Sequence, residues 1–347
     1  MKILIIQQKM IGDVLTSTIL FDVIKKKYPD AELHFLLNTH TFTVVENHPH
    51  IDNLIFFSPK EEQNYWELLK FLWRIKKQKY DVVIDIYGKL SSNLISMFSG
   101  AKTKISYYKP YTSFIYTHPI KRLKTAENGL SLALENRLKL LTALDIDFME
   151  LSPKIHLTKT EKENAKSFLQ KNGIRLDHPM AMISVLGSSA SKTYPKHYMV
   201  KLIQELAKVE NIQILFNYIP AQKNEVEEVY KNCNPETRNK ILIDVYAKSL
   251  RDFIAVTHHC NVVVGNEGGA INMAKALDIP TFAVFSPKIN KKNWLGKQEL
   301  NRHFAIGVED ILDTKDRENL NSEELYAKMQ PEQIVHKLKA FIEKFLN

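Results

Sequence analysis

The chain has 347 residues, of which 44% are hydrophobic and 25% are charged. This composition is typical of a globular protein long enough for two domains. A formal net charge of +9 favours an anionic partner, such as nucleic acid, a membrane face or a phosphorylated substrate. Two cysteines, Cys233 and Cys260, exclude a disulfide framework. With no secretory signal pattern and no apolar run of ~20 residues, we expect a cytoplasmic protein.

The first half of the chain alternates strands and helices in the order typical of a parallel sheet. The pattern predicts strands over 2–6, 32–37, 54–57 and 81–86, an extended segment over 104–107, and helices over 14–28, 65–78, 91–98 and 127–144. Trp66 and Trp73 lie seven residues apart on one face of the second of these helices, and we expect both to pack in the core.

A more polar segment at 147–160 is the predicted linker, and a second α/β series follows it. It comprises strands over 180–186, 213–216, 240–243, 261–264 and 281–285, and helices over 161–172, 197–209, 224–232, 249–258 and 270–276. The basic segment 288–317 is predicted to be irregular and mobile, and 331–345 to form an amphipathic helix.

These patterns predict an α/β protein with two Rossmann-like, doubly wound domains that face each other across a cleft. The N-terminal domain, 1–155, would bind an acceptor, and the C-terminal domain, 156–330, a donor. The helix at 331–347 is a candidate to pack back on the N-terminal domain. Ligands of such sheets bind outside the carboxyl ends of the strands, so the loops at those ends carry the candidate sites.

The loop after the first strand contains Gly12 and Asp13. Asp13 opens a helix, where a carboxylate is either an ordinary N-cap or a functional group. In the functional interpretation it is a general base that takes the proton of an attacking hydroxyl.

A second candidate site begins where the apolar strand 262–264 runs into a glycine-rich turn and a helix of small residues. Gly268 and Gly269 would let a phosphate approach the open N–H groups of the helix start, and Glu267 could hydrogen-bond a ribose or sugar hydroxyl. The alternative is a plain strand-to-helix turn. The pattern is neither GxGxxG nor a Walker loop, so neither NAD nor an NTPase is favoured.

A third candidate is the loop 186–195, which contains Gly187, Ser188, Ser189 and Lys192. Its hydroxyls and N–H groups could hold phosphate oxygens, and Lys192 could neutralise a diphosphate leaving group. The alternative is a flexible polar loop.

In their order and spacing, these three loops resemble those of the ADP-heptose:lipopolysaccharide heptosyltransferases, glycosyltransferase family 9. The matching residues are Gly12 and Asp13; Gly187, Ser188, Ser189, Lys192, Tyr194 and Pro195; and Gly265, Gly269 and Ala274. The segment 80–85 resembles a further part of the family.

The resemblance implies a GT-B fold, an inverting and metal-independent reaction, Asp13 as general base and a donor site in the C-terminal lobe. It also implies an acidic, lipid-linked acceptor at the inner membrane, and so a protein peripheral to its cytoplasmic face. Lys192 would assist catalysis at the leaving group. No cofactor is expected beyond the substrate nucleotide-sugar.

The donor motif departs from the family pattern of Asp-Thr-Gly followed by His. This chain has Glu267, Gly268 and Gly269, with Asn272 in place of the imidazole. A threonine hydroxyl and an imidazole are thereby lost as phosphate contacts. The donor is therefore left open between ADP-heptose and another nucleotide-sugar.

No metal ligand set is predicted. Asp145 and Asp147 spell the DxD of metal-dependent glycosyltransferases, but they follow a helix and not an apolar strand. Neighbours such as His258, His259 and Cys260 cannot all face one ion, because zinc ligands are usually spaced by two or more residues.

The predicted acceptor contacts are Gly12 and four lysines in or beside loops of the N-terminal domain: Lys9, Lys89, Lys102 and Lys104. Solvated surface lysine is the alternative for each of them. Two further classes stay open, a basic nucleic-acid-binding protein and a nucleotide-sugar epimerase. Against the former, the sequence has no recognition-helix, RRM or KH signature.

Overall fold

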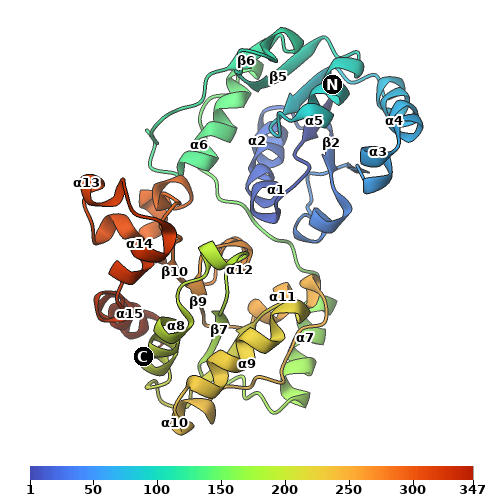
Figure 1. Ribbon diagram of the computed structural model, residues 1–347. Coiled ribbons are helices and arrows are strands. Elements are labelled where there is room, and N and C mark those ends of the chain that lie inside the picture. The colour runs from blue at the N-terminus through green and yellow to red at the C-terminus, as the bar shows by residue number, and fades with distance from the viewer. Residues whose placement is uncertain (347) are drawn as a thin grey trace. The chain divides into compact units, whose positions relative to one another are not determined.

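A computed structural model describes residues 1–346 of the chain. It consists of two compact α/β units, the first formed by Met1–His156 and the second beginning at Leu157 (Figure 1). The division falls inside the predicted linker, one residue from the predicted boundary.

The first unit is built on a six-stranded sheet with the strand order β3-β2-β1-β4-β5-β6, and every neighbouring pair is parallel. Its strands are β1 (Lys2–Ile6), β2 (Glu32–Leu37), β3 (Asn53–Phe56), β4 (Val82–Asp85), β5 (Thr103–Tyr107) and β6 (His118–Ile120). The order reverses direction between β1 and β4. The loops after these two strands therefore flank the point where doubly wound sheets bind ligands.

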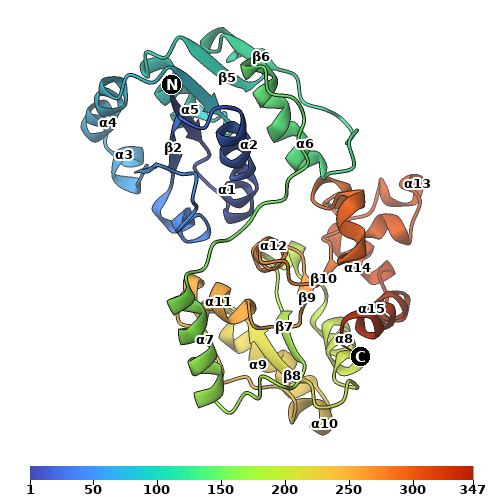
Figure 2. The same ribbon diagram turned by 180° about the vertical axis from the view of Figure 1, so that it is seen from behind.

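The helices of this unit cover both faces of the sheet (Figures 1 and 2). They are α1 (Ile11–Ser17), α2 (Ile19–Lys27), α3 (Pro59–Gln63), α4 (Tyr65–Lys77), α5 (Leu90–Phe98) and α6 (Leu132–Lys139), with 3-10 turns η1 (Thr39–Val44), η2 (Ser113–Ile115) and η3 (Leu140–Leu144). Crossovers that run in opposite directions along a sheet place their helices on opposite faces. Thus α4 and α5 pack together on one face, and α1, α2 and α6 on the other.

Two predicted helices of this unit have different bounds in the structure. The helix expected over 14–28 divides at Thr18, because the hydroxyls of Ser17 and Thr18 donate back to main-chain oxygens of the preceding turn. The helix expected over 127–144 begins only at Leu132, because the Glu135 carboxylate accepts from the main-chain N–H groups of residues 127 and 128 and holds them in a loop.

The tryptophan prediction is wrong. Trp66 and Trp73 are 70% and 60% exposed, because α4 turns a different stripe toward the sheet. That stripe is formed by Phe71, Leu72 and Ile75, which are buried.

The second unit has a parallel five-stranded sheet with the order β11-β10-β9-β7-β8. The strands are β7 (Met180–Ser184), β8 (Gln213–Asn217), β9 (Val262–Asn266), β10 (Thr281–Val284) and β11 (His303–Ile306). In place of the strand predicted over 240–243 there is a single parallel bridge from Ile241 to Ile214 of β8. The order reverses between β7 and β9, so the loops after these two strands flank the second switch point.

Its helices are α7 (Lys159–Lys171), α8 (Lys196–Leu206), α9 (Lys223–Asn232), α10 (Pro235–Arg238), α11 (Leu250–Thr257), α12 (Gly269–Ala276), α13 (Thr314–Arg317), α14 (Ser322–Lys328) and α15 (Pro331–Phe345). Short 3-10 turns are η4 (Ala190–Lys192), η5 (Pro220–Gln222), η6 (Lys291–Asn293), η7 (Lys297–Asn301) and η8 (Val308–Asp310). The segment predicted to be irregular thus contains β11, and ion pairs from Lys291 to Asp310 and from Lys275 to Glu299 tie it down.

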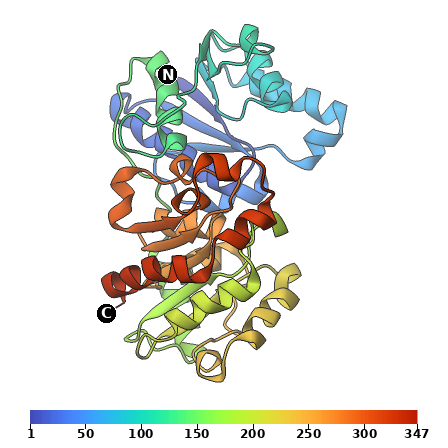
Figure 3. The same cartoon turned by 60° about the vertical axis from the view of Figure 1, so that its left-hand side comes forward.

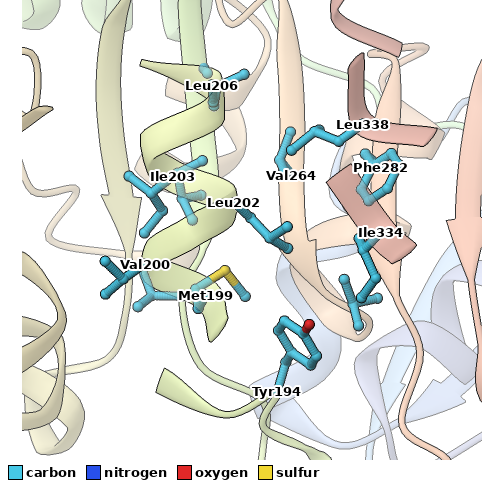
Figure 4. Close-up of a cluster of buried hydrophobic side chains, with 14 of the residues drawn as sticks. Tyr194, Met199, Val200, Leu202, Ile203, Leu206, Val264, Phe282, Ile334 and Leu338 are labelled. Atoms are coloured by element: carbon cyan, nitrogen blue, oxygen red, sulfur yellow. The ribbon is translucent and has the colours of Figure 1, made fainter. Parts of the chain in front are cut away.

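The core of the second unit includes the last helix. Figure 4 shows Met199 and Leu202 of α8, Val264 of β9, and Ile334 and Leu338 of α15 in one cluster of buried side chains. The apolar face of α15 is buried in this core, and the helix packs along α8 and β11 (Figure 3). That this helix packs back on the N-terminal domain stays a prediction, and its apolar stripe lies in the core of the second unit.

Candidate functional site

Asp13 lies in the first turn of α1, after the carboxyl end of β1, and Arg137 of α6 holds its carboxylate. Arg137 Nη2 is 2.8 Å from Asp13 Oδ1 and 3.3 Å from the main-chain oxygen of Asp13. Arg137 also donates to Ser17 Oγ over 3.0 Å and to the Ala133 carbonyl over 2.9 Å. The side chain of Arg137 is 7% exposed and that of Asp13 is 34% exposed. The arginine is therefore fixed on several sides, and it presents a carboxylate that a ligand can reach.

The loop that leads to Asp13 is unusual in its backbone. Met10, which caps α1, has a φ of 66° and a ψ of 120°, a conformation that residues with a Cβ rarely adopt. Gln8 anchors the same loop, since its Oε1 accepts from Ser91 Oγ of α5 over 2.7 Å. Backbone strain of this kind persists only where the surrounding structure enforces it, and it is found most often at ligand-binding sites.

Asp85 ends β4 and organises the neighbouring loop. Its buried carboxylate accepts from the Gly88 N–H over 2.8 Å and from the Tyr116 hydroxyl over 2.6 Å. Burial raises the pKa of Asp85, and these hydrogen bonds oppose that rise. Gly88 has a φ of 56°, which suits glycine, and its carbonyl accepts from Lys109 Nζ. Asp85 thus shapes the loop from inside.

The predicted acceptor lysines do not all reach this edge of the sheet. Lys9 does, but Glu62 binds its Nζ over 2.8 Å, and this hydrogen bond raises the pKa of Lys9. Lys89 also lies at this edge, as the N-cap of α5. Lys102 and Lys104 lie at the amino end of β5, where Thr103 pairs with Val82, so the structure does not bring them to Asp13.

Two other cations, Lys109 and Arg122, lie at this edge of the sheet instead. Lys109 Nζ donates to the carbonyl of Gly88, the residue before Lys89. Burial lowers the pKa of Lys109, and the nearby charges of Lys89 and Arg122 lower it further. Arg122 stacks on the Tyr107 ring, with its guanidinium carbon 3.6 Å from the ring centroid. Lys109 lies just after β5, at the same carboxyl edge as Asp13.

In the second unit, the glycine turn after β9 opens onto the start of α12. Gly268 is its N-cap, with a φ of 146°, and no atom lies within 4 Å of the place where a Cβ would project. Gly269 begins the helix, and Asn272 lies half-buried in its first turn. The unpaired N–H groups and the helix dipole favour an anion at such a place.

The loop after β7 lies beside this turn because Asn266 joins the two. The Asn266 side chain is fully buried; its amide donates to the carbonyls of Ser184 and Val185, and its oxygen accepts from the Tyr194 N–H over 2.6 Å. Gly265 allows the main chain of β9 to lie close to that of β7 at Ser184, since a Cβ at residue 265 would lie 2.3 Å from the Ser184 oxygen. Packing of two main chains therefore positions both loops.

Gly187 likewise allows the two ends of the loop after β7 to lie close together, because a Cβ at residue 187 would lie 2.1 Å from the Lys192 carbonyl oxygen. Ser188 and Ser189 are exposed beyond it, and Lys192 is half-buried. Burial raises the pKa of Glu267, and the neighbouring charge of Lys192 opposes this rise. The structure thus gathers the predicted donor residues of both loops at one edge.

Comparison with known proteins now identifies the family. The family model described as glycosyltransferase family 9 (heptosyltransferase) matches residues 68–325, more than half of the chain. The chain belongs to glycosyltransferase family 9. It is therefore a glycosyltransferase, and its two parallel-sheet domains are those of the GT-B fold.

Relatives of this family 9 chain span nearly its whole length. Lipopolysaccharide heptosyltransferase 1 of Campylobacter coli is 24% identical over an alignment that covers 90% of each chain. A family 9 structure from Veillonella parvula has a TM-score of 0.82 at 16% identity, covering 99% of this chain and 97% of that one. The ADP-heptose lipopolysaccharide heptosyltransferase II of Escherichia coli has a TM-score of 0.73 at 17% identity and 99% coverage of both.

Sequence reasoning missed four residues of this glycosyltransferase that the structure brings to the candidate sites. They are Arg137, Lys109, Arg122 and Asn266. The only local signal was for Asn266, a polar residue at the end of an apolar strand. Arg137 lies 124 residues from Asp13, so no spacing rule could link them.

The DxD sequence begins at the end of a 3-10 turn. Asp145 is the C-cap of η3, with a φ of 54°, as expected for polar residues at the end of a helix.

Within residues 1–346, no group of three or more His, Cys, Asp or Glu side chains is placed to hold a metal ion. In the same residues, no helix combines the length and apolar character required to cross a bilayer.

Proposed function

We propose that this glycosyltransferase moves a heptose from ADP-heptose to an acidic acceptor of the lipopolysaccharide core, with inversion at the anomeric carbon and without a metal ion. The observation that carries the proposal is the reachable Asp13 carboxylate held by Arg137 at the switch point of the first sheet. Further support comes from relatives named as lipopolysaccharide heptosyltransferases and from an Escherichia coli heptosyltransferase solved with ADP.

In the proposed step, an acceptor hydroxyl attacks the anomeric carbon as Asp13 takes its proton. The bond from that carbon to the diphosphate oxygen breaks, and the nucleoside diphosphate leaves with the electron pair. Attack opposite the leaving group inverts the configuration. Lys192, the Ser188 and Ser189 loop, and the N–H groups of Gly268 and Gly269 would stabilise the departing charge, the task that a metal ion performs in other enzymes.

The nucleoside would lie farther along the same edge. Gln222 donates to the Gly187 carbonyl over 3.2 Å and so joins the loop after β8 to the phosphate loop. Beyond it, Tyr218 and Tyr246 pack with ring centroids 4.8 Å apart, beside a cavity of about 440 Å³. Aromatic rings at this place offer a stacking surface for a base. Glu267 and Asn272 would hydrogen-bond ribose or sugar hydroxyls.

For the acceptor we propose the cluster of Lys89, Lys109 and Arg122, with Gly12 allowing close approach to Asp13. Three neighbouring cations at the carboxyl edge would bind phosphate or carboxylate groups of a core oligosaccharide. Lys9 would join them only by exchanging its bond with Glu62. Such an acceptor is lipid-linked, so the enzyme would work at the cytoplasmic face of the inner membrane.

Calorimetric titration with ADP, UDP, GDP and CDP tests the donor. We expect selective ADP binding, weakened about tenfold or more by Lys192→Ala because a charge-assisted contact to phosphate is lost. Lys196→Ala is the matched control, since that lysine is paired with Glu228 on α9. Selective binding of another diphosphate would leave the family and reaction class unchanged but contradict ADP-heptose as donor.

A transfer assay with ADP-heptose and a core acceptor then tests the reaction. Product should form in the presence of EDTA, and its anomeric configuration should be opposite to that of the donor. Abolition by EDTA with restoration by Mg²⁺ would contradict metal independence, and retained configuration would contradict direct displacement.

A further inference from the structure

The outer face of α4 and α5 exposes an unusual set of large apolar side chains. We define this aromatic face by its exposed residues Trp66, Trp73, Leu90, Met97, Phe98 and Phe114. By contrast, within residues 157–346 the exposed large apolar side chains are Leu176, Ile219 and Leu300, each on a different segment. Isolated apolar residues are normal on a surface, but a concentration of them marks an interaction site.

The phase of α4 shows that the two tryptophans share one stripe. Trp66, Lys70, Trp73 and Lys77 recur at intervals of three and four residues, so they lie along one side of the helix. The core-facing residues Phe71, Leu72 and Ile75 lie opposite. The Nζ of Lys77 lies 3.5 Å from the centre of the Trp73 ring, so charge and ring are presented together.

The apolar character continues on α5 and beyond. The buried side of α5 carries Ser92, Asn93, Ile95 and Ser96, and its exposed residues are the apolar side chains at 90, 97 and 98. α5 packs between α4 and η2, and Phe114 of η2 is 80% exposed. α4 and α5 pack against each other on the same face of the sheet (Figures 1 and 2), so their outer sides both lie away from that face.

We propose that the aromatic face lies on the surface of an anionic phospholipid bilayer. Tryptophan favours the membrane interface, since its ring is apolar and its N–H is polar. α4 carries four basic side chains against one acidic one, Glu67, which pairs with Lys70. Lys70 and Lys77 alternate with the two rings, and this excess of positive charge suits anionic headgroups. A second copy of the chain is a poorer occupant, because Lys70 and Lys77 would oppose like charges across a symmetric contact.

The aromatic face also adjoins the catalytic loop. α5 starts at the carboxyl edge of the sheet, and Ser91 in its first turn donates to Gln8 in the loop that leads to Asp13. Placing Leu90 at a bilayer surface therefore brings Asp13 to the level where a lipid-linked acceptor presents its sugar. This inference rests on the proposed function for its purpose, but the binding itself needs neither donor nor acceptor.

Vesicle co-sedimentation of the full chain tests the binding directly. The vesicles are phosphatidylcholine alone, or phosphatidylcholine with about 30 mol % phosphatidylglycerol. We expect binding to the anionic vesicles, at least tenfold weaker binding to the neutral ones, and release by about 0.5 M NaCl. Absence of binding to the anionic vesicles would overturn the proposal.

Paired variants locate the surface. Trp66→Ser with Trp73→Ser, and Met97→Ser with Phe98→Ser, should each weaken binding at least tenfold because the inserted apolar area is lost. Lys70→Glu with Lys77→Glu should weaken it roughly fivefold or more per lysine. The matched control, Leu300→Ser with Lys231→Glu, removes an exposed apolar and an exposed basic residue of the second unit and should bind as wild type. Equal binding by all variants would overturn the proposal.

Two further readouts separate this proposal from others. In a Trp294→Phe background, where only Trp66 and Trp73 remain of the three tryptophans, anionic vesicles should shift the emission to the blue. A wild-type dimer that the face variants convert to monomers would instead assign the face to self-association and overturn the bilayer proposal.

Activity distinguishes failure of the proposed function from failure of the membrane surface. The face variants should lose transfer to a vesicle-embedded acceptor and keep transfer to the same acceptor after delipidation. Vesicle binding without transfer to either acceptor would contradict the proposed reaction alone. Transfer to the embedded acceptor that is unchanged in the face variants would contradict the membrane surface alone.

Discussion

The carboxyl edges of the two sheets are built by different means. In the first unit, charged side chains form the edge: Asp13 is paired with Arg137, and Lys9 with Glu62. In the second unit, main chain forms it: Gly187 and Gly265 allow close contacts that a Cβ would prevent, and Gly268 leaves the start of α12 open. On the proposed assignment the difference follows from the substrates. An acceptor hydroxyl requires a proton acceptor, whereas a diphosphate requires several N–H donors and one cation.

The comparison predicts that chemistry depends most on the first edge. Asp13→Asn keeps the size of the side chain but cannot take a proton, so kcat should fall about 1000-fold while the Kd for ADP stays within twofold. Asp30→Asn, at an exposed aspartate of the same unit, is the control. Stopped assays and calorimetry on the same preparations measure both quantities. Near-normal turnover by Asp13→Asn would remove the general-base role.

Folding should depend most on the second edge. Gly265→Ala places a Cβ 2.3 Å from the main-chain oxygen of Ser184 and should lower the free energy of unfolding of the second unit by about 3 kcal/mol or more. Gly173→Ala, where the φ is 79° but no atom lies within 4 Å, should cost only about 1 kcal/mol. Urea denaturation measures both. Equal losses of unfolding free energy in the two variants would show that the positive φ of these glycines, and not the close approach of main chains, determines the cost of the substitution.

A further test of the first edge concerns how Arg137 acts on Asp13. We infer that it is a positioning residue, because it binds Asp13, Ser17 and the Ala133 carbonyl at once. Arg137→Lys keeps the charge but loses the planar fork, so kcat should fall roughly 10- to 100-fold with little change in the KM for donor. Ser17→Ala removes one partner of the arginine and leaves the bond to Asp13. A parallel loss of stability and activity in both variants would indicate a purely structural role.

Acid should weaken both units through their buried histidines. Burial lowers the pKa of His48 in the first unit to about 4 and that of His303 in the second to about 3. The unfolded chain takes up these protons near pH 6.5, so the folded state binds fewer of them. Stability should be complete above about pH 6.5 and fall toward pH 4, by roughly 1–3 kcal/mol for each histidine. Urea denaturation at several pH values measures this, and His48→Gln should flatten the dependence in the first unit. If the unfolding free energy of His48→Gln depended on pH as steeply as that of the wild type, other titratable groups would be responsible for the pH dependence.

Much of the architecture could be read from the sequence, because its signals are local. Apolar runs of four to six residues followed by helical periodicity predict βα units, and glycines or small polar residues mark the turns between them. These signals suffice to place Asp13, the Gly187–Lys192 loop and the Gly268–Gly269 turn at the ends of strands. That each loop lies beside its neighbour at one edge follows from parallel pairing.

Tertiary packing alone decided the rest. Arg137 reaches Asp13 across 124 residues because α6 packs on α1, and no local pattern encodes that pairing. Lys102 and Lys104 differ from Lys109 only in their position along β5, yet this decides which end of the sheet each one reaches. Trp66 and Trp73 point outward because the sheet covers the opposite stripe of α4. Sequence periodicity shows that a helix has two faces, but which face becomes buried depends on the complementary surface that packs against it.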